Sequence, residues 1–347
     1  MAISDYPFIE AWRKVLTLSR LEPGQTVTIL TSATTHPQTL ACATTAAQSL
    51  GAIVNRLDLP PVNGEKALSR DALAYLGTTP LTGNRAAIAM LEASDIVLDL
   101  MTLLFSPEQH QILQTGTKIL LAVEPPEVLM RMVPSMEDKE RVTAAAARIA
   151  AAREMRVRSA AGTDLRCPLG EFPAISEYGF VDEPGRWDHW PSGFALTWPN
   201  EGQAQGHIVI DRGDILLPQK CYVQDPIHLT VENGYAVRIE GGLSAELLRD
   251  YMESFNDPEA YAISHIGWGL QPRARWSTLG LYDPEATIGM DARAFEGNFL
   301  FSLGPNNEAG GNRTTACHID IPLRNCDVFL DEQPVVRQGK VLDKEQK

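Results

Sequence analysis

Apolar runs and alanine-rich amphipathic stretches alternate along the first part of the chain. Strand patterns stand at residues 25–30, 52–57, 95–100 and 118–123. Helical patterns lie between or after them, at residues 36–51 and 84–92, from Pro107 onward, and at residues 137–153. The last strand pattern is apolar throughout, which is typical of a strand buried on both faces of a parallel sheet. The alternation predicts a doubly wound α/β domain at residues 1–155.

From Glu154 onward, short alternating strands and tight turns replace this pattern. Asn233-Gly234 stands between two β-rich runs, and this dipeptide favours a type I′ hairpin turn. Residues 207–211 and 318–321 alternate polar and apolar side chains, and one helical pattern covers residues 244–255. Residues 156–347 are therefore predicted to form a mainly antiparallel β (α+β) domain, which we expect to bind a metal and carry the chemistry.

Composition limits the classes of protein that fit this pattern. The 347 residues, 44% of them hydrophobic, suffice for two ordinary cores. The net charge of −14 argues against nucleic acid, because a phosphate backbone requires clustered Lys and Arg. No apolar run reaches a membrane span, and the first residues lack an export signal. Five cysteines without a CxxC pair favour reduced thiols, so we expect a cytoplasmic protein without membrane or nucleic-acid partners.

The sheet has no phosphate-binding motif. Neither GxGxxG nor GxxxxGK[ST] occurs in the sequence, which removes the main support for a dinucleotide or ATP site. Ligands of open α/β sheets still bind beyond the carboxyl ends of the strands, so residues 31–36 and 101–106 are candidate pocket loops. The alternative is that both are ordinary connections.

A histidine and a carboxylate two residues apart suggest a metal site near the end of the chain. On a strand, His318 and Asp320 would project from the same face. With His265, which a glycine-rich stretch at residues 264–269 would hold at a constrained turn, they make two histidines and one carboxylate. That set holds non-haem Fe(II) on one face and leaves the opposite face open. The alternative is a solvent-facing polar pair on a strand and a packing histidine.

Residues 176–193 combine two Trp, a His, an Arg and four carboxylates with several Gly and Pro. This composition predicts an irregular binding loop that could enclose a flat aromatic ligand. A surface Ω-loop fastened by its own Trp side chains is the alternative. Further on, Arg293 could contact an anion or hydroxyl group of a ligand, or form a surface salt bridge.

Long segments of the chain resemble one enzyme family. The likeness is carried by residues 81–84, 122–127, 176–179, 182–193, 264–270 and 318–326. These segments are similar to those of the 2,5-dihydroxypyridine 5,6-dioxygenases of bacterial nicotinic acid degradation, and the likeness extends over nearly the whole chain. That family resembles, in fold, the aminopeptidase T group of metallopeptidases.

The resemblance implies a reaction and a cofactor. The chain is expected to use O2 and Fe(II) to open 2,5-dihydroxypyridine between C5 and C6 and give N-formylmaleamate. The iron ligands carried over are His265, His318 and Asp320, the same set that the residue pattern selects. A homo-oligomer is also expected.

Carried-over pocket residues complete the expected site, namely Glu177, His189, Arg293, Ser302 and Phe105. Deprotonation of the hydroxypyridine requires a base, and the unperturbed pKa of a histidine, about 6.5, suits this task. His189 is expected to be this base, with Glu177 orienting the imidazole or the ring. Phe105 cannot transfer protons, so no base is expected from its loop.

Two other classes of function compete with the dioxygenase. A metal-dependent aminopeptidase-like hydrolase would fit the related fold, but a two-metal site needs several bridging carboxylates. This chain offers one clear carboxylate, Asp320, beside its histidines. A non-catalytic protein that binds a small molecule would hold no metal.

Overall fold

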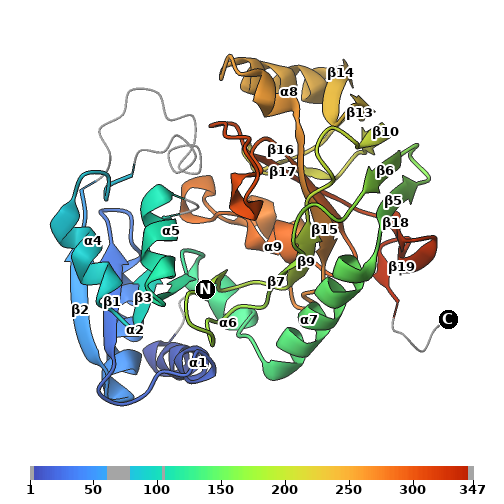
Figure 1. The fold of residues 1–347 in the computed structure, drawn as a ribbon. Helices are drawn as coiled ribbons and strands as arrows, with labels where there is room; N and C mark the ends of the chain where they lie inside the picture. The colour runs from blue at the N-terminus through green and yellow to red at the C-terminus, as the bar shows by residue number, and fades with distance from the viewer. Residues whose placement is uncertain (1–3, 61–78, 104–105, 343–347) are drawn as a thin grey trace. The chain divides into compact units, whose positions relative to one another are not determined.

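The described residues of the computed structural model, 4–60, 79–103 and 106–342, form two compact units (Figure 1). Unit 1 consists of residues up to 139 together with 177–192 and 282–290. Unit 2 consists of residues 140–176, 193–281 and 291 onward. The sequence-based domain boundary at residue 155 stays a prediction.

Unit 1 is built on a parallel sheet. Its strands, in spatial order, are β2 (Ile53–Asp58), β1 (Thr26–Thr31), β3 (Ile96–Asp99), β4 (Lys118–Leu121) and β8 (Trp187–His189). Val27 of β1 pairs with Val54 on one side and Ile96 on the other, all in parallel register. The predicted α/β alternation is confirmed for this part of the chain.

Helices cover the sheet of unit 1 and start where the sequence supplies caps. They are α1 (Asp5–Leu18), α2 (Pro37–Ser49), α4 (Arg85–Glu92), α5 (Pro107–Gln114) and α6 (Pro126–Arg131). Asn84 caps α4 by accepting a hydrogen bond from Ala87 N at 3.1 Å, and Ser106 caps α5 in the same way. One core joins Leu91 of α4 and Ile112 of α5 to Val97 of β3. Ile96 points to the opposite face and is equally buried, so both faces are covered.

The segment 176–193 differs from the irregular loop that its composition predicts. Trp187, Asp188 and His189 form β8, and His189 pairs with Leu121 of β4. Trp190 is fully buried, and its ring lies 4.9 Å from that of Trp12. The backbone N–H and C=O groups at the edge of β4 form hydrogen bonds with residues 187–189, and this pairing stabilises even a short, polar strand. The sequence of the segment does not show that such an edge is available to it.

Unit 2 contains an eight-stranded sheet. Its strands are β14 (Tyr235–Gly241), β13 (Ile227–Glu232), β10 (Gln205–Ile210), β6 (Asp164–Pro168), β5 (Glu154–Ser159), β18 (Cys326–Leu330), β19 (Gln333–Arg337) and β20 (Lys340–Val341). Its strands pair in antiparallel register, as predicted. Asn233 and Gly234 have φ angles of 51° and 81°, which confirms the type I′ turn between β13 and β14.

A five-stranded sheet positions the candidate site. It consists of β17 (Ile319–Leu323), β16 (Phe299–Leu303), β15 (Ile263–Gly269), β9 (Phe194–Thr197) and β7 (Ile175–Glu177). The other elements are the pair β11 (Ile215–Leu216) and β12 (Cys221–Tyr222), the helices α7 (Met136–Ala151), α8 (Leu243–Glu253) and α9 (Met290–Ala294), and 3-10 turns at Pro258–Tyr261, Trp276–Leu281, Pro284–Ala286 and Asn307–Ala309. Strands β15, β16 and β17 are buried along their whole length.

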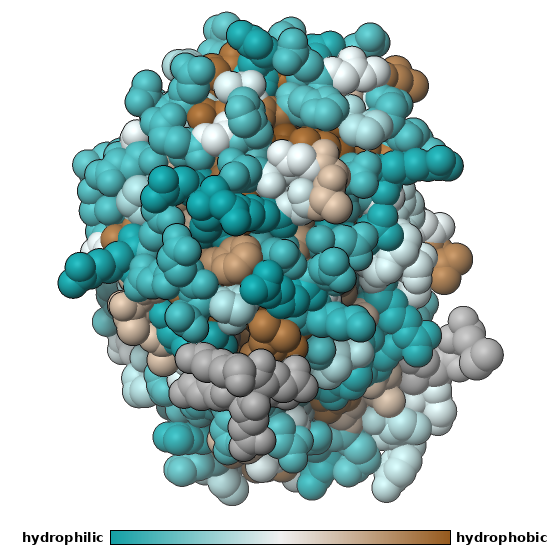
Figure 2. All heavy atoms as spheres, turned by 90° about the vertical axis from the view of Figure 1, so that its right-hand side faces the viewer, coloured by the Kyte–Doolittle hydropathy of each residue, from teal (hydrophilic) through white to brown (hydrophobic). Residues whose placement is uncertain are grey.

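Hydrophilic residues dominate the face drawn in Figure 2, and hydrophobic residues appear there singly or in small groups. This surface agrees with the net charge of −14. Within the described part of the chain, no helix is both long and apolar enough to cross a membrane.

Candidate metal centre

Three neighbouring strands of the five-stranded sheet carry the residues of the predicted metal site. His265 lies on β15, Ser302 on β16 and Asp320 on β17, while His318 directly precedes β17. Ser302 pairs with Asp320 across the β16–β17 ladder. These adjacent strands bring together side chains that are far apart in the sequence.

His265 lies on a bulged strand, not at the constrained turn that its glycine-rich surroundings predict. Ile263 pairs with Leu303 and Ile266 with Phe301, so Ser264 and His265 together face Ser302. Such a bulge redirects the side chains of a strand, and bulges are common beside functional sites. Gly267 lets β15 pack closely against β9, because a Cβ at this position would overlap the carbonyl oxygen of Ala195 on β9. The serine anchors the bulge, since His265 N donates to Ser302 Oγ at 3.0 Å.

The three candidate ligand atoms form a small triangle. Asp320 Oδ1 lies 2.9 Å from His265 Nε2 and 3.2 Å from His318 Nε2, and the two Nε2 atoms are 3.3 Å apart. With metal–ligand bonds of about 2.1 Å, neighbouring ligands lie about 3.0 Å apart in an octahedron and about 3.4 Å apart in a tetrahedron. The triangle therefore has the size of one face of a metal coordination shell.

Unsatisfied atoms in this triangle support a cation. Asp320 Oδ1 is buried and accepts no hydrogen bond of good geometry, although two imidazole nitrogens lie beside it. The imidazole rings of His265 and His318 are perpendicular, with centroids 5.4 Å apart. A metal ion would accept the lone pairs of Asp320 Oδ1 and of both Nε2 atoms, which point into the triangle. Among the described residues, no other group of at least three His, Cys, Asp or Glu has its ligand atoms close enough to hold one ion.

A charged neighbour holds the second oxygen of Asp320. Arg293 Nε donates to Asp320 Oδ2 at 2.5 Å. Burial alone would raise the pKa of Asp320, but the charges of His318, Arg293 and His265 hold it well below its ordinary value. The carboxylate is therefore ionised and ready to bind a cation. Arg293 makes a half-buried ion pair with a candidate metal ligand. The predicted contact of Arg293 with a ligand stays a prediction.

The surroundings of the triangle exclude most water. His265 and Asp320 are each 6% exposed. The ring of Trp198 meets that of His265 edge to face at 6.0 Å. Asn298 supports the same region, because its amide accepts from Gly269 N and donates to Arg293 O. Neither Trp198 nor Asn298 belongs to a recognisable motif, so the sequence does not single them out.

A second cluster lies in unit 1. His189 Nε2 is 2.7 Å from Glu177 Oε2, and His189 Nδ1 is 2.7 Å from the carbonyl oxygen of Pro191. A carbonyl can only accept, so Nδ1 carries a hydrogen and Nε2 faces the carboxylate. Burial alone would lower the pKa of His189, but Glu177, Asp188 and the Pro191 carbonyl together raise it. The Glu177 carboxylate, at 2.7 Å, therefore favours the protonated form of His189.

Asp188 organises this pair, and sequence analysis did not single it out. Its fully buried carboxylate accepts from His189 N at 2.8 Å, from Tyr178 N at 2.9 Å and from Arg186 Nη2 at 2.7 Å. The guanidinium of Arg186 also lies over the ring of Tyr178, 3.8 Å from its centroid. These contacts anchor the backbone directly after Glu177 and at His189 itself.

The structure thus groups the predicted site residues into two sets. His265, His318, Asp320, Arg293 and Ser302 come together in unit 2. Glu177 and His189 come together in unit 1. Phe105 lies outside the described residues.

Comparison with known proteins gives a consistent family match. A family model described as 2,5-dihydroxypyridine 5,6-dioxygenase matches residues 7–343. The 2,5-dihydroxypyridine 5,6-dioxygenase of Pseudomonas putida strain KT2440 is 56% identical over 346 residues, which cover 100% of this chain and 99% of that protein.

Two solved structures share the fold. The structure of 2,5-dihydroxypyridine dioxygenase from Pseudomonas putida KT2440 superposes with a TM-score of 0.96 at 55% identity, covering 100% of both chains. Wild-type AmpT from Thermus thermophilus superposes with a TM-score of 0.62 at 14% identity, covering 98% of this chain and 100% of that one. The second likeness shows the fold alone and agrees with the expected aminopeptidase T-like architecture.

Proposed function

The chain belongs to the 2,5-dihydroxypyridine 5,6-dioxygenase family, and we propose that its His265–His318–Asp320 cluster holds Fe(II) for this reaction. The family match and the relative at 56% identity confirm the identification that the sequence segments implied. The protein is therefore a ring-cleaving dioxygenase. The metal, the proton acceptor and the product are the parts that the proposal adds.

The observation that carries the metal proposal is the triangle of Asp320 Oδ1 and the two Nε2 atoms, with sides of 2.9, 3.2 and 3.3 Å. Two imidazoles and one carboxylate on one face are the donor set of non-haem Fe(II) oxygenases. Fe(II) bound there would supply the redox chemistry that lets O2 react with an electron-rich ring. The protein residues keep this set in place, Ser302 through the His265 backbone and Arg293 through Asp320.

The Glu177–His189 pair is the proposed proton acceptor. Both residues are buried, and His189 Nε2 lies 2.7 Å from Glu177 Oε2. A proton accepted by either atom is therefore held between the two side chains and kept away from solvent. Because Nδ1 is held by the Pro191 carbonyl, the ring offers only Nε2 for proton exchange. Removal of a proton from the hydroxypyridine raises the electron density of the ring, which prepares it for attack by oxygen.

The proposed product follows from the atom balance. Cleavage of the C5–C6 bond places one atom of O2 on each of the two carbons. C5, which already carries a hydroxyl oxygen, becomes a carboxylate, and C6, bonded to nitrogen, becomes a formyl group. The product is N-formylmaleamate, and the reaction fits a step in nicotinic acid degradation.

A metal-dependent aminopeptidase-like hydrolase is the other candidate. Its support is the likeness to AmpT, which at 14% identity concerns the fold alone. Two-metal peptidases need bridging carboxylates, and the single cluster found among the described residues contains one carboxylate, Asp320. The dioxygenase is therefore the better supported function.

We also propose a cellular location and an assembly state. All five cysteines are free thiols, which fits a reducing compartment such as the cytoplasm. A homo-oligomer stays a prediction that light scattering in solution would test.

Oxygen uptake on 2,5-dihydroxypyridine tests the proposal. Metal-free protein is loaded anaerobically with Fe(II) or with Zn(II), and turnover is measured with 18O2. We expect turnover with Fe(II) alone and two labelled oxygen atoms in the product. Equal turnover with Zn(II), or without O2, would contradict the dioxygenase and favour hydrolysis, because Zn(II) has no redox chemistry.

A further inference from the structure

A fully buried carboxylate, that of Asp188, lies beside the Glu177–His189 pair in unit 1. Its Oδ1 accepts a hydrogen bond from His189 N at 2.8 Å. Its Oδ2 accepts from Tyr178 N at 2.9 Å and from Arg186 Nη2 at 2.7 Å. Burial of a charge is costly, and these three donors offset the cost.

The partners of Asp188 require a carboxylate. All three are hydrogen-bond donors, and they approach both oxygens of the side chain. A protonated acid, or the amide of an asparagine, would direct a hydrogen toward one of these donors. Asp188 therefore carries its negative charge at neutral pH, although burial raises its pKa.

Asp188 joins the two segments that carry the proposed proton acceptor. Glu177 ends β7 and His189 ends β8, and these strands belong to different sheets. One side chain binds both segments, because it accepts from Tyr178 N, directly after Glu177, and from His189 N. Asp188 thus holds together the backbone on which the 2.7 Å contact between Glu177 and His189 depends.

The charge of Asp188 also acts on the imidazole. Burial alone would lower the pKa of His189, and the charges of Glu177 and Asp188 raise it. The phenol of Tyr178 adds no charge, because burial raises its pKa. Strand β4 places an uncharged residue, Leu121, opposite His189 in the parallel ladder. Glu177 and Asp188 are therefore the two charges that favour the imidazolium.

Arg186 carries the opposing charge. Its guanidinium donates to Asp188 and lies over the ring of Tyr178, 3.8 Å from the ring centroid. A positive charge at this place favours the neutral imidazole, whereas the charge of Asp188 favours the imidazolium. The protonation of His189 thus depends on the balance between Asp188 and Arg186.

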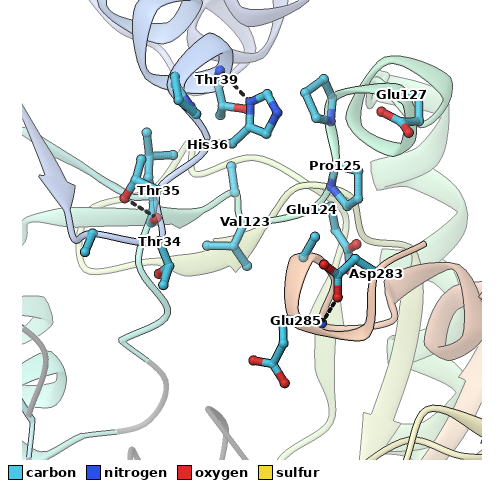
Figure 3. Close-up of a pocket in the computed structure, with 16 residues that line it drawn as sticks. Thr34, Thr35, His36, Thr39, Val123, Glu124, Pro125, Glu127, Asp283 and Glu285 are labelled. Atoms are coloured by element: carbon cyan, nitrogen blue, oxygen red, sulfur yellow. Dashed lines mark hydrogen bonds between the residues drawn. The ribbon is translucent and has the colours of Figure 1, made fainter. Parts of the chain in front are cut away.

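Exposed carboxylates of unit 1 stand apart from this network. Figure 3 shows Glu127, Asp283 and Glu285 around a cavity of about 500 Å³, and none of residues 177–189 lines it. Water and salt screen charges that are exposed in this way. The charge of Asp188 is fully buried and is screened much less.

We propose that Asp188 is a positioning residue that fixes both the spacing and the protonation of the Glu177–His189 pair, with Arg186 as its counter-charge. Its effect on turnover rests on the proposed function, in which this pair accepts the proton of the hydroxypyridine. Its effect on His189 does not rest on that function, so the two effects can be measured separately.

Histidine-selective 15N NMR measures the effect on His189 directly. The full-length protein is loaded with diamagnetic Zn(II), and His189→Ala identifies the signals of this residue. Asp188→Asn should lower the pKa of His189 by about one pH unit or more, because it removes a buried negative charge. An unchanged pKa in the folded variant would overturn the proposal.

Arg186 variants give a shift of the opposite sign. Arg186→Gln removes the counter-charge and should raise the pKa of His189, and Arg186→Lys keeps the charge and should restore most of the normal value. Damage to packing alone would not move the pKa in opposite directions. These variants test the proposal even where Asp188→Asn fails to fold, and a pKa that does not rise in Arg186→Gln would contradict it.

Asp182→Asn is the matched control. Asp182 is also buried, pairs with Lys139 and accepts from the Tyr178 hydroxyl at 2.7 Å. It binds the side chain of Tyr178 rather than the backbone of the pair, so its loss should leave the pKa of His189 unchanged. A shift as large as that of Asp188→Asn would show a general effect of lost charge and overturn the proposal.

The pH–rate profile of the Fe(II)-loaded enzyme separates the two proposals. The acidic limb should move to lower pH in Asp188→Asn and to higher pH in Arg186→Gln, with kcat affected more than KM. Limbs that follow the pKa of His189 would support both proposals. A shifted pKa with an unmoved limb would support the role of Asp188 at His189 and contradict the pair as the proton acceptor.

Discussion

Arg293 Nε donates to Asp320 Oδ2 at 2.5 Å, while Asp320 Oδ1 lies 2.9 Å from His265 Nε2. The two oxygens of one carboxylate thus have different tasks. Oδ2 is held by the guanidinium, which leaves Oδ1 directed toward the two imidazoles. Partners that orient a ligand in this way contribute to metal affinity as well as to geometry.

Arg293→Gln should therefore lower the affinity for Fe(II) about 10- to 100-fold. Competition with a chelator under anaerobic conditions measures this affinity. Arg166→Gln, which changes an exposed arginine paired with Glu154, is the matched control and should bind iron normally. If Arg293→Gln keeps full iron affinity and only raises KM, Arg293 contacts the substrate, as the sequence first suggested.

Replacement of any proposed iron ligand should abolish both metal binding and activity. We expect His265→Ala, His318→Ala and Asp320→Ala to lose iron and turnover together, because each removes one of three protein ligands. Iron content and oxygen uptake measure the two effects. His228→Ala, on an exposed position of β13, serves as control. Full iron and near-normal turnover in one of the three variants would remove that residue from the ligand set.

The Glu177–His189 pair should control the acidic side of the pH–rate profile. His189→Ala should lower kcat about 10²- to 10⁴-fold while iron stays bound. Glu177 and other neighbours raise the pKa of His189, so turnover should fall as the pH drops through this raised value. Glu177→Gln removes the carboxylate and lowers that pKa, which should shift the acidic limb to lower pH. An unchanged kcat and pH profile in both variants would show that the pair only binds substrate.

Asp99 should make stability depend on pH. Its carboxylate accepts from the backbone N–H groups of Met101, Thr102 and Leu103, yet burial raises its pKa to about 6. The unfolded value is about 3.9, so the folded protein holds this proton more tightly. The resulting stabilisation is complete below about pH 4 and is lost as the pH rises through about 6.

Asp99→Asn should remove this dependence. The difference in unfolding free energy between the wild type and the variant should change by about 3 kcal/mol between pH 4 and 7, as the pKa difference requires. Urea unfolding at several pH values measures it. A constant difference across this range would contradict the raised pKa of Asp99.

The sequence alone was sufficient to predict those features that depend on residues close together along the chain. The alternation of strand and helix patterns in residues 25–123 predicts the parallel sheet, because side-chain periodicity is a local property. Asn233-Gly234 predicts its own turn, because both residues tolerate positive φ. His318 and Asp320 lie two residues apart, and strand geometry by itself places them on one face.

Only the tertiary structure decided how distant segments meet. The bulge that presents His265 exists because β15 pairs with β16, and the pairing of β16 with β17 brings Asp320 beside it. His189 became part of a sheet through the edge of β4, against the irregular structure that its own segment predicts. Strand pairing is stabilised by hydrogen bonds and burial across the chain, and the residues on one side of such a pair do not reveal their partner.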